Sequence, residues 1–217
     1  MCAVETVIHP DFHFSHNFTY DVALLRLPEP VYQFPVVTLN SAQGGAYSAI
    51  SPGQNVTILG WGLTETGLAQ TLREGTVPLV PRATCSEISA FRKAQAPITS
   101  TMVCAGQQLP PSGQVWPALP PVDACQGDSG GPMIAQGSSA SGDVQLGIVS
   151  FGIGCAQPGV PGVYTDVVSV KDFIDSTVEQ FSTHLSPSPA PTSSSVPSLA
   201  SLLQGGNEIQ ARSGYNG

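Results

Sequence analysis

Short runs of apolar and β-branched residues, interrupted by glycine and proline, constrain the fold more than any other feature of this sequence. Each run is bounded by turn-forming residues, which is the pattern of a β-strand. The runs that we interpret as strands are 3–8, 21–27, 75–80, 102–106, 131–136, 144–152 and 162–167, with a further strand ending at Ile58. With 23 glycines and 20 prolines, the chain holds too many helix-breaking residues for a helical bundle. We therefore predict an all-β fold, either a barrel or a sandwich.

Helical periodicity appears in two places. Residues 84–94 favour a short helix or helical turn, and the stretch 170–185 favours a longer helix because its apolar side chains recur at helical spacing. The predicted apolar face consists of Val170, Phe173, Ile174, Thr177, Val178 and Phe181. We expect this helix to dock on the barrel at the end of the fold.

The charge balance excludes several classes of partner. The formal net charge is −8, and the 7 Lys and Arg residues are spread along the chain. No basic patch is therefore available for nucleic acid or for an anionic membrane surface. No apolar run is long enough to span a membrane. We predict neither nucleic-acid binding nor membrane binding.

Cysteine usage indicates an oxidising compartment. The 5 cysteines include no C-x-x-C pair, and the 4 histidines are scattered, which does not fit a zinc site. We predict disulfides, no metal, no cofactor, and secretion to the extracellular space. Two candidate glycosylation sequons, at Asn17 and Asn55, agree with this interpretation. Met1 is followed by no signal peptide, and from this we expect that an N-terminal portion is missing.

The motif Gly127-Asp128-Ser129-Gly130-Gly131 carries the strongest chemical signal. As G-x-S-x-G it fits the nucleophile elbow of α/β-hydrolases, which needs a buried strand before the serine and a helix after it. Here polar residues precede Ser129 and Gly-Gly-Pro follows it, although Asp172 and His184 lie downstream as an elbow requires. As G-D-S-G-G-P the motif fits a second pattern, which we favour.

In that second pattern the sequence resembles the trypsin/chymotrypsin-like serine proteases over residues 3–184. The resembling segments follow the family's order: HPDF and YDVALLRL, LGWG, TCSE and TSTMVCAG, DACQGDSGGP, GIVSFGIGCAQPGVPGVYTDV and the final helix. The resemblance implies a trypsin-like double β-barrel, with the first barrel incomplete, and a C-terminal α-helix. It also implies the disulfides Cys85–Cys104 and Cys125–Cys155.

The chain then divides into three parts. Residues 1–50 are the C-terminal part of the first barrel, and residues 51–185 are the second barrel with its helix. Residues 186–217 form a Ser/Pro-rich tail whose composition predicts disorder. The proline-rich segment 107–122 is predicted to be a surface loop.

The resemblance implies a role for each residue of the site. Ser129 is the nucleophile, the N–H groups of Gly127 and Ser129 form the oxyanion hole, and Asp21 orients a histidine base. The residues of the substrate pocket are Asp123 at its floor, Gly152 and Gly162 in its walls, and Ser150 on the strand that pairs with the substrate. A carboxylate at the floor implies cleavage after Arg or Lys. Phe151 departs from the family pattern, which has Trp there.

The family's histidine base has no counterpart in this sequence. It lies in an AAHC motif well before the aspartate, whereas His9, His13, His16 and His184 have no adjacent cysteine. The new amino terminus that the family pairs with the acid before the serine, here Asp128, is also absent. Loss of the triad histidine costs about a millionfold in rate in subtilisin. We therefore expect the chain as given to be nearly inactive.

Two functions remain open at this point. In the first, the chain is a fragment of a secreted trypsin-like serine endopeptidase, which hydrolyses peptide bonds through an acyl-enzyme. In the second, it is a non-catalytic homologue that binds proteins through the retained pocket. The expected partners are protein or peptide substrates and protein protease inhibitors, and we expect a monomer. Cys2 is the odd cysteine, either parted from an upstream mate or a lone thiol.

Overall fold

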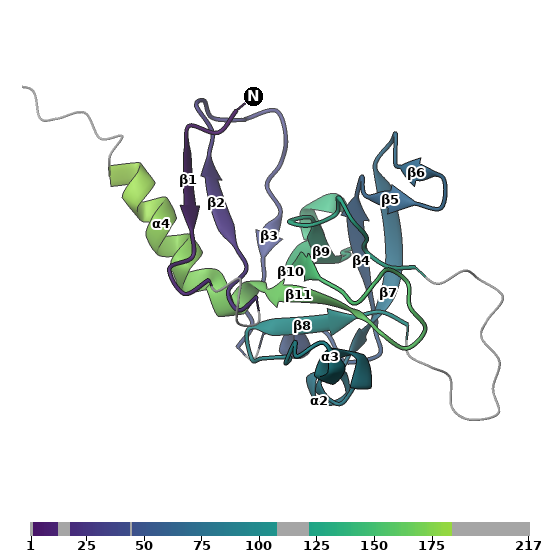
Figure 1. Ribbon diagram of the computed structural model, residues 1–217. Helices are drawn as coiled ribbons and strands as arrows, with labels where there is room; N and C mark the ends of the chain where they lie inside the picture. Colours follow the sequence, from purple (N-terminus) through teal and green to yellow (C-terminus); the bar gives the residue numbers. More distant parts are fainter. Residues whose placement is uncertain (1, 13–17, 44, 108–121, 184–217) are drawn as a thin grey trace, which may run out of the picture. The chain divides into compact units, whose positions relative to one another are not determined.

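Six antiparallel strands form a closed barrel in the computed structural model, which describes residues 2–12, 18–43, 45–107 and 122–183. The strand order is β11-β8-β7-β4-β9-β10, and β10 pairs back onto β11 (Figure 1). The strands are β4 Asn55–Gly60, β7 Arg73–Val80, β8 Met102–Ala105, β9 Pro132–Ala135, β10 Val144–Phe151 and β11 Gly162–Asp166. The prediction of an all-β barrel is confirmed.

Strand β11 is buried along its whole length because it separates two apolar clusters. Tyr164 belongs to the cluster inside the barrel, and the adjacent Val163 belongs to a second cluster outside it. This alternation follows from the two-residue period of a strand. The short helices α2 (Arg82–Ser86) and α3 (Ser89–Lys93) contribute Cys85 and Phe91 to the second cluster. These two helices match the predicted helical turn at 84–94.

The N-terminal residues form a separate two-stranded antiparallel sheet of β1 (Glu5–Ile8) and β2 (Ala23–Arg26). Helix α4 (Lys171–Thr183) lies beside β1 (Figure 1). The His9 ring lies 4.7 Å from the Phe173 ring and the Arg26 guanidinium lies 5.5 Å from the Phe181 ring, so one face of the sheet packs on this helix. The opposite face is apolar and exposed, through Val4, Ile8, Leu25 and Leu27. A sheet face of this kind is suited to covering by further polypeptide.

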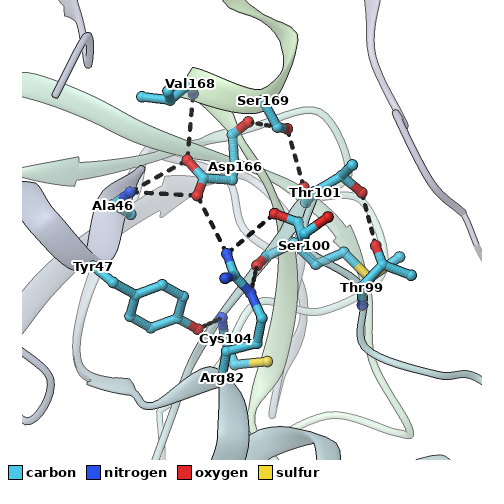
Figure 2. A network of polar contacts seen from close by, with 11 residues as sticks. Ala46, Tyr47, Arg82, Thr99, Ser100, Thr101, Cys104, Asp166, Val168 and Ser169 are labelled. Carbon is cyan, nitrogen blue, oxygen red and sulfur yellow. Dashed lines mark hydrogen bonds and ion pairs between the residues drawn. The ribbon is translucent and has the colours of Figure 1, made fainter. Parts of the chain in front are cut away.

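The buried carboxylate of Asp166, at the end of β11, binds the segment that begins at Ala46 to the barrel (Figure 2). Asp166 is 2% exposed, and its Oδ1 accepts hydrogen bonds from the N–H of Ala46 (3.3 Å) and of Val168 (3.3 Å). Arg82 Nη2 lies 3.7 Å from Asp166 Oδ2, and the Arg82 guanidinium lies 4.9 Å from the Tyr47 ring. Burial raises the pKa of Asp166, while these donors and Arg82 partly oppose the shift. The network therefore fixes helix α1 (Ala46–Ala49) against the barrel wall.

The short elements were not predicted. They are β3 (Thr38–Leu39), α1, the hairpin of β5 (Leu63–Thr64) and β6 (Gly67–Leu68), and two 3₁₀ turns, Ala140–Gly142 and Val167–Val170. Strand β3 adds to the barrel sheet by parallel pairing with β10. The helix prediction is wrong at Val178, which is 51% exposed, because α4 packs through Phe173 and Phe181 instead.

Several predictions lie outside the described residues: the proline-rich segment at 108–121, the tail at 186–217, the sequon at Asn17, and His13, His16 and His184. The domain boundaries stay a prediction. Cys2 is exposed and carries no disulfide, and Asn55 is exposed at the start of β4. In the ranges that the structure describes, no helix is long and apolar enough to cross a membrane, and no group of three or more His, Cys, Asp or Glu side chains could hold a metal ion.

Candidate active site

Two backbone hydrogen bonds join the loop that carries Ser129 to strand β10. The N–H of Gly130 donates to the carbonyl of Val149 at 2.9 Å, and the N–H of Val149 donates to the carbonyl of Gly131 at 2.9 Å. Both bonds lie within two residues of Ser129, whose side chain is on the exposed side of the loop. The position of the serine is therefore set by the barrel wall.

Two N–H groups of the serine loop, those of Gly127 and Ser129, have no hydrogen-bond partner among the described residues. The N–H of Asp128 donates to the carbonyl of Cys125 (3.0 Å), and the N–H groups of Gly130 and Gly131 are also paired. The N–H groups of Gly127 and Ser129 make no hydrogen bond with any residue that the structure describes. Gly127 has φ +96°, a left-handed conformation that a side chain would strain. The loop thus carries two backbone N–H groups, two residues apart, that no described residue occupies.

Asp128 is paired, contrary to the sequence interpretation that left it without a partner. Its Oδ1 accepts a hydrogen bond from the N–H of Gly62 at 2.7 Å, and its Oδ2 accepts one from the N–H of Cys125 at 2.9 Å. A Cβ at Gly60 or Gly62 would overlap this carboxylate. The Gly-Trp-Gly turn after β4 therefore fits against the serine loop because both of its glycines lack side chains.

Asp21 lies against the same strand as the serine loop. Its Oδ2 accepts a hydrogen bond from Ser150 Oγ at 2.7 Å, and its main-chain carbonyl accepts one from Thr165 Oγ1 at 2.9 Å. Ser150 directly follows Val149, the residue that holds the serine loop. Asp21 and Ser150, which are 129 positions apart in the sequence, are therefore in direct contact. Sequence reasoning missed Thr165, since a threonine in a buried strand carries no chemical signal of its own.

A pocket of about 270 Å³ opens beside Ser129. Ser150, Gly152, Gly162 and Tyr164 are among the residues that line it. Phe18 lines it as well, and its ring stacks on Phe151 with the centroids 5.2 Å apart. The structure thus brings most of the predicted pocket residues to one place, while Phe18 and Tyr164 were not predicted.

Asp123 lies behind the pocket wall. Its Oδ2 accepts a hydrogen bond from the N–H of Ala156 at 2.8 Å, and its Oδ1 accepts one from the N–H of Ala124 at 2.9 Å. A Cβ at Gly162 would come within 2.9 Å of Asp123 Oδ1 and 3.1 Å of the Tyr164 hydroxyl. Burial raises the pKa of Asp123, the two N–H donors oppose the rise, and the Asp128 charge adds to it. Among the described residues, however, Asp123 does not line the pocket beside Ser129 but a neighbouring cavity of about 100 Å³, which Gly60, Gly62 and Asp128 also line.

His9 is the histidine that the structure describes, and its surroundings do not suit a base for Ser129. Its ring stacks on Tyr20 at 4.4 Å and packs on Phe173, and its Nδ1 accepts a hydrogen bond from the N–H of Asp11 at 3.1 Å. These contacts place it between the β1–β2 sheet and α4.

Two disulfides brace the site. Cys125–Cys155 joins the serine loop to the segment after β10, and Cys85–Cys104 joins α2 to β8. These are the two pairs that the resemblance implies.

Comparison with known proteins gives a family and several relatives. A model of the Trypsin family matches residues 2–174. The vitellin-degrading protease of Bombyx mori is 37% identical over 173 residues, which cover 78% of this chain and 57% of that protein. Phenoloxidase-activating factor 1 of Holotrichia diomphalia is 33% identical, with coverage of 80% and 44%, and the clotting factor G beta subunit of Tachypleus tridentatus is 33% identical, with coverage of 78% and 53%. The chain spans about half the length of these curated relatives.

Proposed function

The chain belongs to the trypsin family, and on that premise we propose that it carries the nucleophile and substrate pocket of a serine endopeptidase that cleaves after Arg or Lys. One observation carries the proposal: β10 holds the serine loop at Val149 and Asp21 at Ser150, beside the pocket. A nucleophile and an orienting acid that are bonded to the same strand, beside a substrate pocket, fit acyl transfer.

In this proposal Ser129 Oγ attacks the scissile carbonyl, and the N–H groups of Gly127 and Ser129 stabilise the resulting oxyanion. One such donor contributes about 3 kcal/mol to transition-state stabilisation in subtilisin. Asp21, fixed by Ser150, would hold a histidine base in the productive tautomer. The base takes the Ser129 proton and passes it to the amine as the scissile C–N bond breaks, which leaves the acyl-enzyme on Ser129. Water then hydrolyses the acyl-enzyme and frees the serine hydroxyl and the new carboxylate.

Specificity for Arg or Lys follows from Asp123. Its carboxylate lies directly behind Gly162, and each of its oxygens accepts a backbone N–H, which leaves further lone pairs for a substrate cation. A guanidinium or ammonium group in the pocket would relieve the cost of burying this charge. We therefore propose that a cationic side chain fills the pocket beside Ser129.

The base comes from outside the described residues in this proposal, since His9 is packed between aromatic rings. That same packing favours the second candidate, a non-catalytic homologue that binds proteins through the pocket. Strand β2 begins two residues after Asp21, and the sheet that it forms with β1 has an exposed apolar face, which further polypeptide carrying the base would cover.

Secretion and the partners belong to the proposal as well. Two disulfides support an oxidising compartment. Trypsin-like proteases act on protein substrates, and we propose protein inhibitors as further partners and a monomeric state.

The test is hydrolysis of matched peptides that differ only at the residue before the scissile bond, Arg, Lys or Phe. Mass spectrometry of the products locates the cut. In a full-length product that supplies the histidine base, we expect cuts after Arg and Lys, and no cuts with Ser129→Ala. Binding of the Arg peptide without cleavage would favour the non-catalytic homologue, and cleavage after Phe but not Arg would refute the role of Asp123.

A further inference from the structure

Asp21 sits in a turn rather than in a strand ladder. The N–H of Val22 donates to the carbonyl of Tyr20 at 2.8 Å, which closes a three-residue turn with Asp21 at its centre. Tyr20 has φ +55°, in the left-handed region that residues with a side chain seldom adopt. Strand β2 begins only at Ala23. The peptide of Asp21 therefore needs an outside contact to fix its orientation.

Thr165 supplies that contact. Its Oγ1 donates to the carbonyl of Asp21 at 2.9 Å, while Ser150 Oγ donates to the Asp21 carboxylate at 2.7 Å. One bond holds the main chain of Asp21 and the other holds its side chain. The two donors come from the neighbouring strands β10 and β11, where Ile148 pairs with Thr165.

Thr165 is itself rigidly placed. It is 1% exposed, and its β-branched side chain restricts the first side-chain torsion. It pairs with Met102 of β8 on its other side. The next residue, Asp166, is anchored by the network of Figure 2, with its N–H donating to the carbonyl of Thr101 at 2.9 Å. The Thr165 hydroxyl therefore projects from a strand end that is fixed from several directions.

We propose that Thr165 is a positioning residue for Asp21: its hydroxyl sets the tilt of the Asp21 peptide so that the carboxylate meets Ser150. This inference rests on the proposed function, in which the Asp21 carboxylate orients the base. The plainer interpretation is that a buried threonine donates to the nearest carbonyl and that the carboxylate does not depend on it. The two interpretations predict different chemical shifts for the carboxyl carbon (Cγ) of Asp21 when the Thr165 hydroxyl is removed.

The test is NMR of the full chain with ¹³C-labelled aspartate, observing the carbonyl carbon and the Cγ of Asp21. Thr165→Val keeps the size of the side chain and removes the hydroxyl, and Thr165→Ser keeps the hydroxyl. Ser150→Ala, which breaks the direct bond, gives the reference shift of Cγ. Thr57→Val is the matched control, since Thr57 is equally buried, at 3% exposed, in strand β4.

We expect Thr165→Val to move both signals, with the Cγ shift comparable to that of Ser150→Ala, and Thr165→Ser to leave both near the wild-type positions. Movement of the carbonyl carbon alone would show a purely structural bond and overturn the proposal. So would an unchanged spectrum, or an equal Cγ shift in Thr57→Val. If Thr165→Val does not fold, Thr165→Ala replaces it and Thr57→Ala becomes the control, and the same shifts of the Asp21 carbonyl carbon and Cγ are expected.

Peptide cleavage supplies a second and separable readout. With Arg peptides, we expect kcat to fall by about 10- to 100-fold in Thr165→Val, because a misplacement of about 1 Å has effects of this order, with KM nearly unchanged and with rescue by Thr165→Ser. An unchanged kcat would contradict the positioning role. Absence of cleavage by a full-length product that supplies the histidine base would count against the proposed function, whereas the Cγ signal would still decide the inference about Thr165.

Discussion

Replacement of Asp123 by Asn should abolish selective binding of cationic side chains. The substitution keeps the size of the side chain and removes its charge, and it also loses one of the two backbone hydrogen bonds because the amide has a single acceptor oxygen. A hydrogen bond to a charged group contributes about 1.5–3 kcal/mol, which corresponds to about 10- to 150-fold in Kd. We expect a loss in this range because Gly162 lines the pocket and a Cβ at Gly162 would come within 2.9 Å of the Asp123 carboxylate.

The pH dependence of binding sharpens this prediction. The cation binds the ionised carboxylate, so affinity falls as the pH drops through the pKa of Asp123. Burial raises that pKa above its ordinary value of 3.8, so the loss of affinity should begin at a higher pH than for an exposed aspartate. The Asp123→Asn variant should show weak binding with no such dependence.

Calorimetric titration with benzamidine and with an arginine amide measures both effects, and it requires no catalysis. Asp175→Asn is the control, since Asp175 is an exposed carboxylate on α4 paired with Lys171. Equal affinity of the wild type and Asp123→Asn for both cations would refute the assigned role of Asp123. So would an affinity that rises as the solution is acidified.

Three further predictions concern the pocket, its brace and the buried network. Gly162→Ala should weaken benzamidine binding by roughly tenfold, because the new Cβ would crowd Asp123 and the Tyr164 hydroxyl and overpacking costs about 1–3 kcal/mol. Unchanged affinity in the same titration would show that benzamidine does not bind in this pocket. Replacing the Cys125–Cys155 pair by alanines should lower the free energy of unfolding by about 3–4 kcal/mol for the 30-residue separation, as measured by guanidinium denaturation, and a loss below 1 kcal/mol would contradict this. Burial raises the pKa of Asp166 in the folded protein above 3.8, so the folded state takes up a proton at a higher pH than the unfolded state does. The wild type should therefore gain stability relative to Asp166→Asn as the pH falls through the folded pKa towards 3.8. A relative loss over that range, measured by denaturation at several pH values, would contradict this sign.

Local patterns predicted the barrel strands well, because each one combines apolar or β-branched residues with glycine or proline at its ends. The shortest elements escaped prediction. Strand β3 has two residues and exists only because it pairs with β10, far along the chain. The outward position of Val178 likewise depends on where α4 meets the β1–β2 sheet, which periodicity alone does not specify.

In the candidate site, too, the sequence predicted some features and missed others. The motif around Ser129 and the resemblance it supports pointed to Asp21, Asp123 and Ser150 before their positions were known. The contact between Asp21 and Ser150 joins residues 129 apart, so it follows from the fold alone. The pairing of Asp128 with the backbone of Gly62 and the bond from Thr165 to Asp21 carry no signal in the local sequence. Donors supplied by backbone N–H groups or by ordinary buried threonines become visible only in three dimensions.

The most direct test of the central claim is ¹¹B NMR of the chain with a peptide boronic acid that carries an arginine side chain. Attack by Ser129 Oγ would turn the trigonal boron tetrahedral, with the N–H groups of Gly127 and Ser129 holding the new oxygen and Asp123 binding the guanidinium. We predict a tetrahedral boron signal for the wild type, a weaker one for Asp123→Asn, and only the trigonal signal for Ser129→Ala. A wild-type spectrum identical to that of Ser129→Ala would contradict the account.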